Sequence, residues 1–254
     1  MPMTPTASDV SSDIRPPARQ SVPWKNTPLV VGTISTAPGL SHLIEAPEGI
    51  DLVEVRLDLL LSKGVHPDKI QEAMANRSVP TLLTLRTRDE GGAFNWRSRQ
   101  RVLFFLKFIP FADVVDLELI NIPRLSRVLR MVRRTKRDLI ISSHSLKRKL
   151  TTLRLRRLLS QFRKTRARLY KIVGLARRKR DLLTLAEPLL NQSHMRLAIM
   201  ASGPLATASR LSLPALGSRL LYVHLDEPAA PGQPGHNTVF TISDLKSNFS
   251  PKKA

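Results

Sequence analysis

The sequence predicts a single-domain α/β fold, and three observations predict it. The chain has 254 residues, 42% of them hydrophobic, which is enough for one complete core. Short runs rich in Val, Ile and Leu alternate with helical stretches along most of its length. There are eight such runs, the number that closes a (β/α)8 barrel, also called a TIM barrel.

The expected strands are short and almost entirely apolar, as in parallel strands that are covered on both faces. They span residues 29–33, 52–57, 81–85, 114–119, 139–142, 169–173, 197–200 and 220–224. Helices are expected at residues 67–75, 97–108, 123–134, 150–166, 181–191, 207–216 and 242–249. A doubly wound open sheet is the alternative, but it usually has a glycine-rich phosphate loop after its first strand, and residues 32–39 do not match one.

The ends of the chain and its composition set the remaining limits. Residues 1–26 are rich in Ser, Thr, Pro and Asp without an apolar period, which predicts a disordered arm before a barrel at residues 27–250. The absence of cysteine excludes disulfides, thiolate metal sites and cysteine nucleophiles. No apolar run reaches the roughly 18 residues that cross a bilayer, and no secretion signal begins the chain. We therefore expect a soluble, cytoplasmic protein.

The net charge of +21 comes from one stretch of the chain. Residues 122–180 hold 22 Lys and Arg against one acid, Asp138, and the remainder is neutral. These basic residues share the expected helices with regularly spaced leucines, which favours a solvated outer face. The alternative is a docking surface for an acidic partner, nucleic acid or an anionic membrane. No aromatic platform or recognised nucleic-acid motif accompanies the stretch.

Ionisable residues lie at or near the carboxyl ends of the expected strands. Burying charge beside apolar strands is costly unless partners are present, so this placement predicts one shared polar pocket. The βα loops of a barrel open on the same face. The residues are Glu54, Arg56, Arg86, Glu90, His144, Lys171 and Arg210, with Gln233 in a loop after the last strand that is long enough to act as a lid. Asp58 alternates with Glu54 and Arg56 and is expected on the same side of one strand.

The residue types in this pocket predict carbonyl chemistry. Burial of Lys171 between apolar neighbours disfavours its charged form, and a neutral amine forms a Schiff base with a ketone or aldehyde. His144 can exchange protons near neutral pH, and Glu90 could orient its ring. Three arginines require an anionic ligand. The alternatives are a lysine that extends out of the barrel and a structural histidine.

Seven segments follow the order and spacing of a known family from about residue 30 to residue 245. They lie at residues 54–58, 85–92, 115–119, 142–144, 171–173, 209–210 and 230–233. On these segments the chain resembles type I 3-dehydroquinate dehydratase, a lyase of the shikimate pathway that leads to chorismate and the aromatic amino acids. The resemblance implies a β/α barrel, usually a homodimer, that converts 3-dehydroquinate to 3-dehydroshikimate without metal or diffusible cofactor.

The resemblance also implies a role for each pocket residue. Lys171 would form the imine, His144 would move the protons, and Glu90 would hold His144. Arg210 and Gln233 would bind the substrate carboxylate. The residues that would bind or organise the ring hydroxyl sites are Glu54, Arg56 and Arg86.

Three positions depart from the family pattern, and two rival functions remain. Ala229 stands where the family usually has a lid serine, Ser202 where it often has a methionine, and Ala206 where it has a glycine. One rival is another Schiff-base barrel such as a class I aldolase, against which Arg210 and the lid argue. The other is a catalytically weak barrel whose basic face at residues 122–180 binds an acidic macromolecule.

Overall fold

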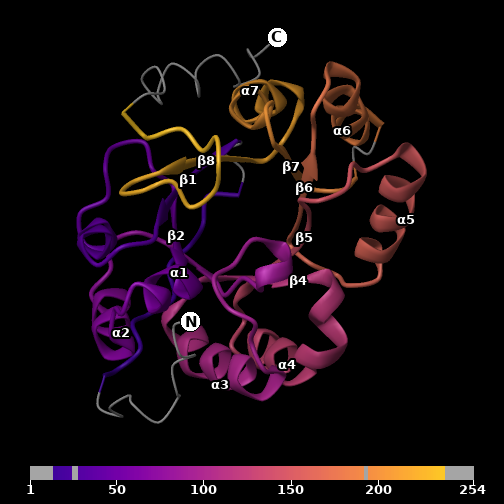
Figure 1. The fold of residues 1–254 in the computed structure, drawn as a ribbon. Helices are drawn as coiled ribbons and strands as arrows, with labels where there is room; N and C mark the ends of the chain where they lie inside the picture. Colours follow the sequence, from indigo (N-terminus) through magenta and orange to yellow (C-terminus); the bar gives the residue numbers. More distant parts are fainter. Residues whose placement is uncertain (1–13, 25–27, 192–193, 238–254) are drawn as a thin grey trace.

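Eight parallel strands form one sheet in the computed structural model, which describes residues 14–24, 28–191 and 194–237. The strand order is β7-β6-β5-β4-β3-β2-β1-β8, and β1 pairs with both β2 and β8, so the sheet curls into a nearly closed barrel (Figure 1). The strands are β1 (Leu29–Ile34), β2 (Leu52–Arg56), β3 (Thr81–Thr84), β4 (Val114–Glu118), β5 (Asp138–Ser145), β6 (Leu169–Leu175), β7 (Leu197–Ser202) and β8 (Leu220–His224).

Helices surround the barrel, as Figure 1 shows. They are α1 (Leu57–Ser62), α2 (Pro67–Ala75), α3 (Ser98–Phe108), α4 (Ser126–Arg134), α5 (Thr152–Arg163), α6 (Lys179–Asn191) and α7 (Ala206–Ser212). Short 3-10 helices are η1 (Pro38–Leu43), η2 (Arg88–Glu90), η3 (Ile109–Phe111), η4 (Leu119–Leu125) and η5 (Leu213–Leu216). The predicted (β/α)8 barrel is therefore confirmed. The expected helix at residues 242–249 lies outside the described residues.

Strands β7 and β8, at the two ends of the strand order, meet through contacts that differ from the ladders between the other neighbouring strands. A backbone hydrogen bond of 2.8 Å runs from Arg219 N, just before β8, to Leu197 O. One residue earlier, the hydroxyl of Ser218 accepts from Ile199 N at 2.9 Å and donates to Ile199 O at 3.1 Å. A serine side chain therefore takes the place of a neighbouring strand at this seam.

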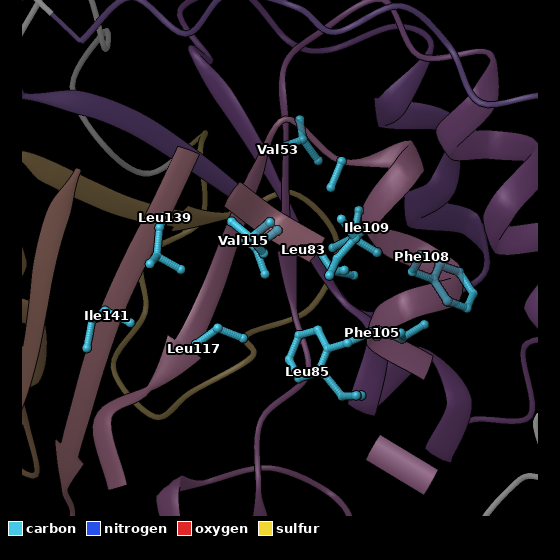
Figure 2. Close-up of a cluster of buried hydrophobic side chains, with 14 of the residues drawn as sticks. Val53, Leu83, Leu85, Phe105, Phe108, Ile109, Val115, Leu117, Leu139 and Ile141 are labelled. Carbon is cyan, nitrogen blue, oxygen red and sulfur yellow. The ribbon is translucent and has the colours of Figure 1, made fainter. Parts of the chain in front are cut away.

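Outward-pointing strand residues pack against the helices and form the main core. Figure 2 shows part of this cluster, in which Val53, Leu83 and Val115 come from neighbouring strands and lie near Phe105 and Phe108 of α3. All five side chains are fully buried. Each such burial stabilises the fold by about 1.5–3 kcal/mol.

Inward-pointing residues form two layers of opposite chemistry. The apolar layer consists of Val31, Leu52, Leu82, Val114, Ile140 and Leu169. Two residues further along the same strands stand Thr33, Glu54, Thr84, Asp116, Ser142 and Lys171, and all are buried. Because residues i and i+2 of a strand point to the same side, this second layer also faces the barrel interior. The polar layer lies toward the carboxyl ends of the strands.

Part of the arm expected to be disordered contacts the barrel instead. Val22 is buried, Trp24 Nε1 donates to Asp138 at 2.8 Å, and Gln20 N donates to Asp113 at 2.7 Å. Isolated anchors of this kind leave no apolar period in a sequence, so the pattern did not reveal them. Residues 1–13 lie outside the described residues, and the domain boundaries stay a prediction.

Asp113, directly before β4, forms a buried ion pair with Arg77 at the amino end of the strands, and its replacement tests how much stability this pair provides. Its carboxylate accepts from Arg77 Nη2 at 2.7 Å and Nε at 3.0 Å, and both side chains are fully buried. Asp113→Ala leaves a buried guanidinium unpaired, so we expect the free energy of unfolding in urea to fall by about 3–5 kcal/mol. As the control, Lys63→Ala breaks the exposed pair with Glu227 and should cost about 1 kcal/mol or less. Equal losses in the two variants would contradict this prediction.

Candidate active site

One cavity of about 340 Å³ at the carboxyl ends of the strands collects the residues singled out in the sequence. Its lining includes Glu54, Arg56, Arg86, Glu90, His144, Lys171, Arg210 and Gln233. The structure thus brings all eight candidate residues together. Residues of the loop after β8, among them Ala229 and Pro231, line the same cavity.

Lys171 lies on β6 in the polar layer, and only 5% of it is exposed. Its Nζ donates to the hydroxyl of Tyr222 at 2.9 Å and lies 3.5 Å from both Glu54 Oε1 and Asp116 Oδ2. Burial lowers the pKa of Lys171; the two carboxylates oppose this shift without cancelling it. The amine therefore does not extend out of the barrel, and its neutral form is favoured relative to a lysine in water.

The two carboxylates beside Lys171 are held by strand residues and by Arg86. Glu54 accepts from the hydroxyls of Thr33 at 3.1 Å and Thr84 at 2.8 Å. Asp116 accepts from Arg86 Nη1 at 3.1 Å and Nη2 at 2.9 Å. Burial alone would raise the pKa of Asp116, but the Arg86 and Lys171 cations outweigh it and hold that pKa below its ordinary range. Both carboxylates are fixed before any ligand binds.

Arg56 ends β2, where the chain turns sooner than the alternation in the sequence predicts. Helix α1 begins at Leu57, so Asp58 lies in its first turn and not on the strand. The fully buried Asp58 accepts from Arg56 Nε at 3.0 Å and Nη2 at 2.8 Å. Asp58 therefore orients the guanidinium of Arg56 from the first turn of α1. This corrects the prediction that Asp58 shares one side of a strand with Glu54.

His144 and Glu90 form a contact pair at the edge of the cavity. Glu90 Oε2 lies 2.8 Å from His144 Nδ1 and accepts from the backbone N of His144 at 3.2 Å. Burial, together with the cations of Arg86 and Lys171, holds the pKa of His144 well below 6.5. Burial also raises the pKa of Glu90 to about 8. When Nδ1 donates to Glu90, the other ring nitrogen has a free lone pair and can accept a proton.

Arg210 has no carboxylate within ion-pair distance among the described residues, unlike Arg56 and Arg86. Its Nη1 donates to the carbonyls of Ala201, Ala206 and Gly232 at 3.1–3.4 Å, and its buried Nε has no partner in the described chain. Burial lowers the pKa of Arg210 to about 10, which still leaves it charged at neutral pH. This is a buried cation that an anionic ligand can neutralise.

Gln233 joins the loop after β8 to the barrel. Its Oε1 accepts from Ala229 N at 3.0 Å, and its Nε2 donates to Thr33 Oγ1 at 3.0 Å. The second Nε2 hydrogen remains available for a ligand. Gln233 therefore both shapes the loop and presents a donor to the cavity.

Sequence reasoning missed five side chains that support the site. Thr33, Thr84, Asp116 and Ser142 belong to the polar layer, and Tyr222 contacts Lys171. The i, i+2 relation within each expected strand could have revealed Asp116, since it follows the inward-pointing Val114. Tyr222 gave no signal, because an aromatic residue in an apolar strand is indistinguishable from a core residue.

Two kinds of feature are absent from the described residues. No group of three or more His, Asp or Glu side chains is placed to hold a metal ion in the described ranges. None of the described helices is both long and apolar enough to cross a membrane.

The fold and the site define a class of protein: a β/α barrel whose mouth combines a buried amine, an imidazole and a guanidinium that pairs with no carboxylate of the described residues. An enzyme that acts on an anionic carbonyl compound uses these three groups.

Comparison with known proteins gives the family. The model of the type I 3-dehydroquinase family matches residues 28–247, and the chain belongs to that family. It is 30% identical over 206 residues to a 3-dehydroquinate dehydratase of Methanocella arvoryzae, covering 81% of this chain and 91% of that protein. A second 3-dehydroquinate dehydratase, of Methanococcoides burtonii, is 26% identical over 86% of this chain and 92% of its own length.

Solved structures agree on the fold. The crystal structure of type I 3-dehydroquinate dehydratase from Clostridium difficile superposes with a TM-score of 0.73 at 19% identity, covering 87% of this chain and 92% of that one. The enzyme from Aquifex aeolicus superposes with a TM-score of 0.69 at 23% identity, covering 88% of this chain and all of that one.

The charges around His144 lead to a titration test. Since Lys171 is one of the cations that lower the pKa of His144, Lys171→Met should make the imidazolium less unfavourable and raise that pKa. NMR titration of the ring should show a midpoint below 6.5 in the unaltered protein and a higher midpoint in the variant. Lys63→Ala, at the surface, is the control and should leave the midpoint unchanged. An unaltered or lower midpoint in Lys171→Met would contradict the electrostatic coupling.

Proposed function

We propose that the chain dehydrates 3-dehydroquinate to 3-dehydroshikimate through a Schiff base on Lys171. The observation that carries this proposal is the buried amine of Lys171 inside a cavity that also holds His144 and Arg210. Family membership and the activity of the relatives, 3-dehydroquinate dehydratases, support the identity of the substrate, an anionic cyclic ketone.

The first step joins Lys171 to the substrate. The neutral amine attacks the ketone carbon, the carbonyl oxygen takes one proton from the amine and one from solvent and leaves as water, and a protonated imine remains; the proton from solvent returns when the imine is hydrolysed. This iminium group withdraws electrons from the neighbouring C–H bond. The depressed pKa of Lys171 supports the step, because only the neutral amine has the lone pair that attacks.

The elimination requires a base and then an acid. His144 takes the proton from the carbon next to the imine, and the electron pair moves into the iminium to form an enamine. The enamine expels the hydroxyl group on the following carbon, which takes a proton from His144 and leaves as water. Hydrolysis of the new iminium consumes one water and releases the enone product and Lys171, so the net change is the loss of one water. Glu90, whose Oε2 lies 2.8 Å from Nδ1, would hold the ring in place while the other ring nitrogen carries the proton between the two transfers.

Arg210 is the group that we assign to the substrate carboxylate. It lacks a carboxylate partner among the described residues, and its Nε is buried without a hydrogen bond. The hydroxyl of Ser202, another cavity residue, is also buried and unpaired in the described part of the chain. A carboxylate would satisfy both donors, and Gln233 would complete the set from the loop.

Glu54, Arg56 and Arg86 also line the cavity and would contact or organise the ring hydroxyls. Their rigid pairing supports this assignment: Arg56 is held by Asp58 and Arg86 by Asp116. A pre-formed polar wall loses little conformational freedom when the substrate binds.

Three wider assignments stay predictions. The chain would act as a homodimer, which light scattering can test, and in the cytoplasm, which fractionation of cells can test. The basic face at residues 122–180 would contact an anionic partner, as the rival function requires.

Covalent trapping tests the proposed function directly. Borohydride added together with 3-dehydroquinate should reduce the imine and leave substrate-derived mass on the peptide that contains Lys171. Lys171→Met should lose both the trapping and the formation of enone while it remains folded, since its hydrocarbon stem is preserved.

The same experiment separates the rivals. An unmodified protein that forms no enone, and that binds heparin with a strong dependence on salt, would favour the polyanion-binding rival. Trapping with other carbonyl compounds but not with 3-dehydroquinate would favour an aldolase.

Ala229 gives a test of the carboxylate pocket. The loop residue lines the cavity and has no side-chain hydroxyl, so Ala229→Ser should add one donor to the substrate. Because this bond forms in the ground state and the transition state alike, we expect KM to fall by about threefold to tenfold and kcat to change little. Steady-state kinetics measures both, with the exposed Ala208→Ser as a control that should change neither. A lower kcat at constant KM would contradict the assignment of the carboxylate to this end of the cavity.

A further inference from the structure

Tyr222 contacts the reactive amine in two ways. It lies on β8, is 4% exposed, and its hydroxyl accepts from Lys171 Nζ at 2.9 Å. The same nitrogen lies 4.1 Å from the centre of its ring. Tyr222 also lines the cavity. This hydroxyl lies nearer to Lys171 Nζ than the carboxylate oxygens of Glu54 and Asp116, which are 3.5 Å away.

The charges around the amine leave Tyr222 uncharged. Glu54 approaches the amine from β2, Asp116 from β4, and the cations of Arg56 and Arg86 from the ends of β2 and β3. Burial raises the pKa of Tyr222 well above 10, and the two carboxylates act in the same direction. The phenol therefore keeps its proton at neutral pH. It can hold a hydrogen bond, but it cannot act as a base.

The nitrogen of Lys171 changes its number of hydrogens during the proposed reaction. An ammonium has three, the free amine two, and the planar iminium one. The N–H of the iminium needs a hydrogen-bond acceptor that holds its proton in place. Without that proton the neutral imine withdraws electrons only weakly. The carboxylates are already engaged, Glu54 by two threonines and Asp116 by Arg86. A neutral hydroxyl at 2.9 Å and the face of its ring suit a cation that must remain protonated.

We propose that Tyr222 is a positioning residue for Lys171, which orients the amine toward the cavity and keeps the imine in its protonated form. This inference rests on the proposed Schiff base. It adds a residue on β8 to a function that otherwise relies on β5 and β6 for its chemistry.

Tyr222→Phe is the variant that isolates the hydroxyl, because the ring and its packing remain. We expect kcat to fall about tenfold while KM stays within about twofold, since a hydrogen bond to a charged intermediate is lost. The hydroxyl also stabilises the ammonium form of the free enzyme, so its removal lowers the pKa of Lys171. The acidic limb of the kcat/KM profile should therefore move to lower pH. Cyanoborohydride, which reduces protonated imines, should trap less substrate at alkaline pH than in the unaltered protein.

Tyr170→Phe provides a matched control. Tyr170 precedes Lys171 on β6 but points outward, where its ring stacks on Phe162 at 5.1 Å between centroids and its hydroxyl accepts from Ala167 N. Tyr170→Phe removes a phenol oxygen from β6, the strand that carries Lys171. We expect the kcat, pH profile and trapping of this variant to match those of the unaltered protein. Thermal unfolding establishes that both variants are folded.

The outcomes separate this inference from the function on which it rests. Failure to trap 3-dehydroquinate on Lys171 in the unaltered protein would overturn the Schiff base itself. Normal trapping together with an unchanged pH profile in Tyr222→Phe would overturn the role of Tyr222 alone. A lower kcat with an unmoved acidic limb, or the same loss in Tyr170→Phe, would indicate a packing role and would also overturn it.

Discussion

The structure depends on the mutual neutralisation of charges buried inside the barrel. Among the described residues, the cations of Lys171, Arg56 and Arg86 stand against the anions of Glu54, Asp58 and Asp116. Isolated, each would be too costly to bury; together, they fix one another and form a rigid polar layer above an apolar one. Arg210 stands outside this balance, with no carboxylate partner in the described chain. Arg210 is therefore the cavity cation that an anionic ligand can pair directly, and the proposed substrate is an anion.

Family membership and local electrostatics support the same chemistry from independent directions. The family model covers residues 28–247 and concerns the whole barrel, whereas the depressed pKa values of Lys171 and His144 follow from burial and neighbouring cations alone. A lysine whose neutral form is more accessible than in water and an imidazole that resists protonation are what imine formation and proton abstraction require. Tyr222 fits the same chemistry. A phenol that keeps its proton can hold the nitrogen of Lys171 by a hydrogen bond without competing with His144 for the substrate proton.

The sequence was sufficient for the barrel and for the eight cavity residues, for physical reasons that also mark its limits. Buried parallel strands are continuous apolar runs, so an ionisable residue at the end of each run is conspicuous, as His144 and Lys171 are. Asp58 was misplaced because a strand and the first turn of a helix cannot be distinguished over two residues. Tyr222 resembles a core residue, and Val22 and Trp24 are lone anchors, so their contacts depend on tertiary structure that no local pattern encodes.

Every strand of the barrel supplies a side chain to the mouth or to its supporting layer: Thr33, Glu54, Thr84, Asp116, His144, Lys171, Ser202 and Tyr222. The cavity therefore exists only in the complete barrel, because no part of the chain shorter than the full set of strands carries all of its lining and supporting residues. The same dispersal means that a replacement on one strand also disturbs groups on others: Asp116 on β4, for example, contacts both Arg86 and Lys171.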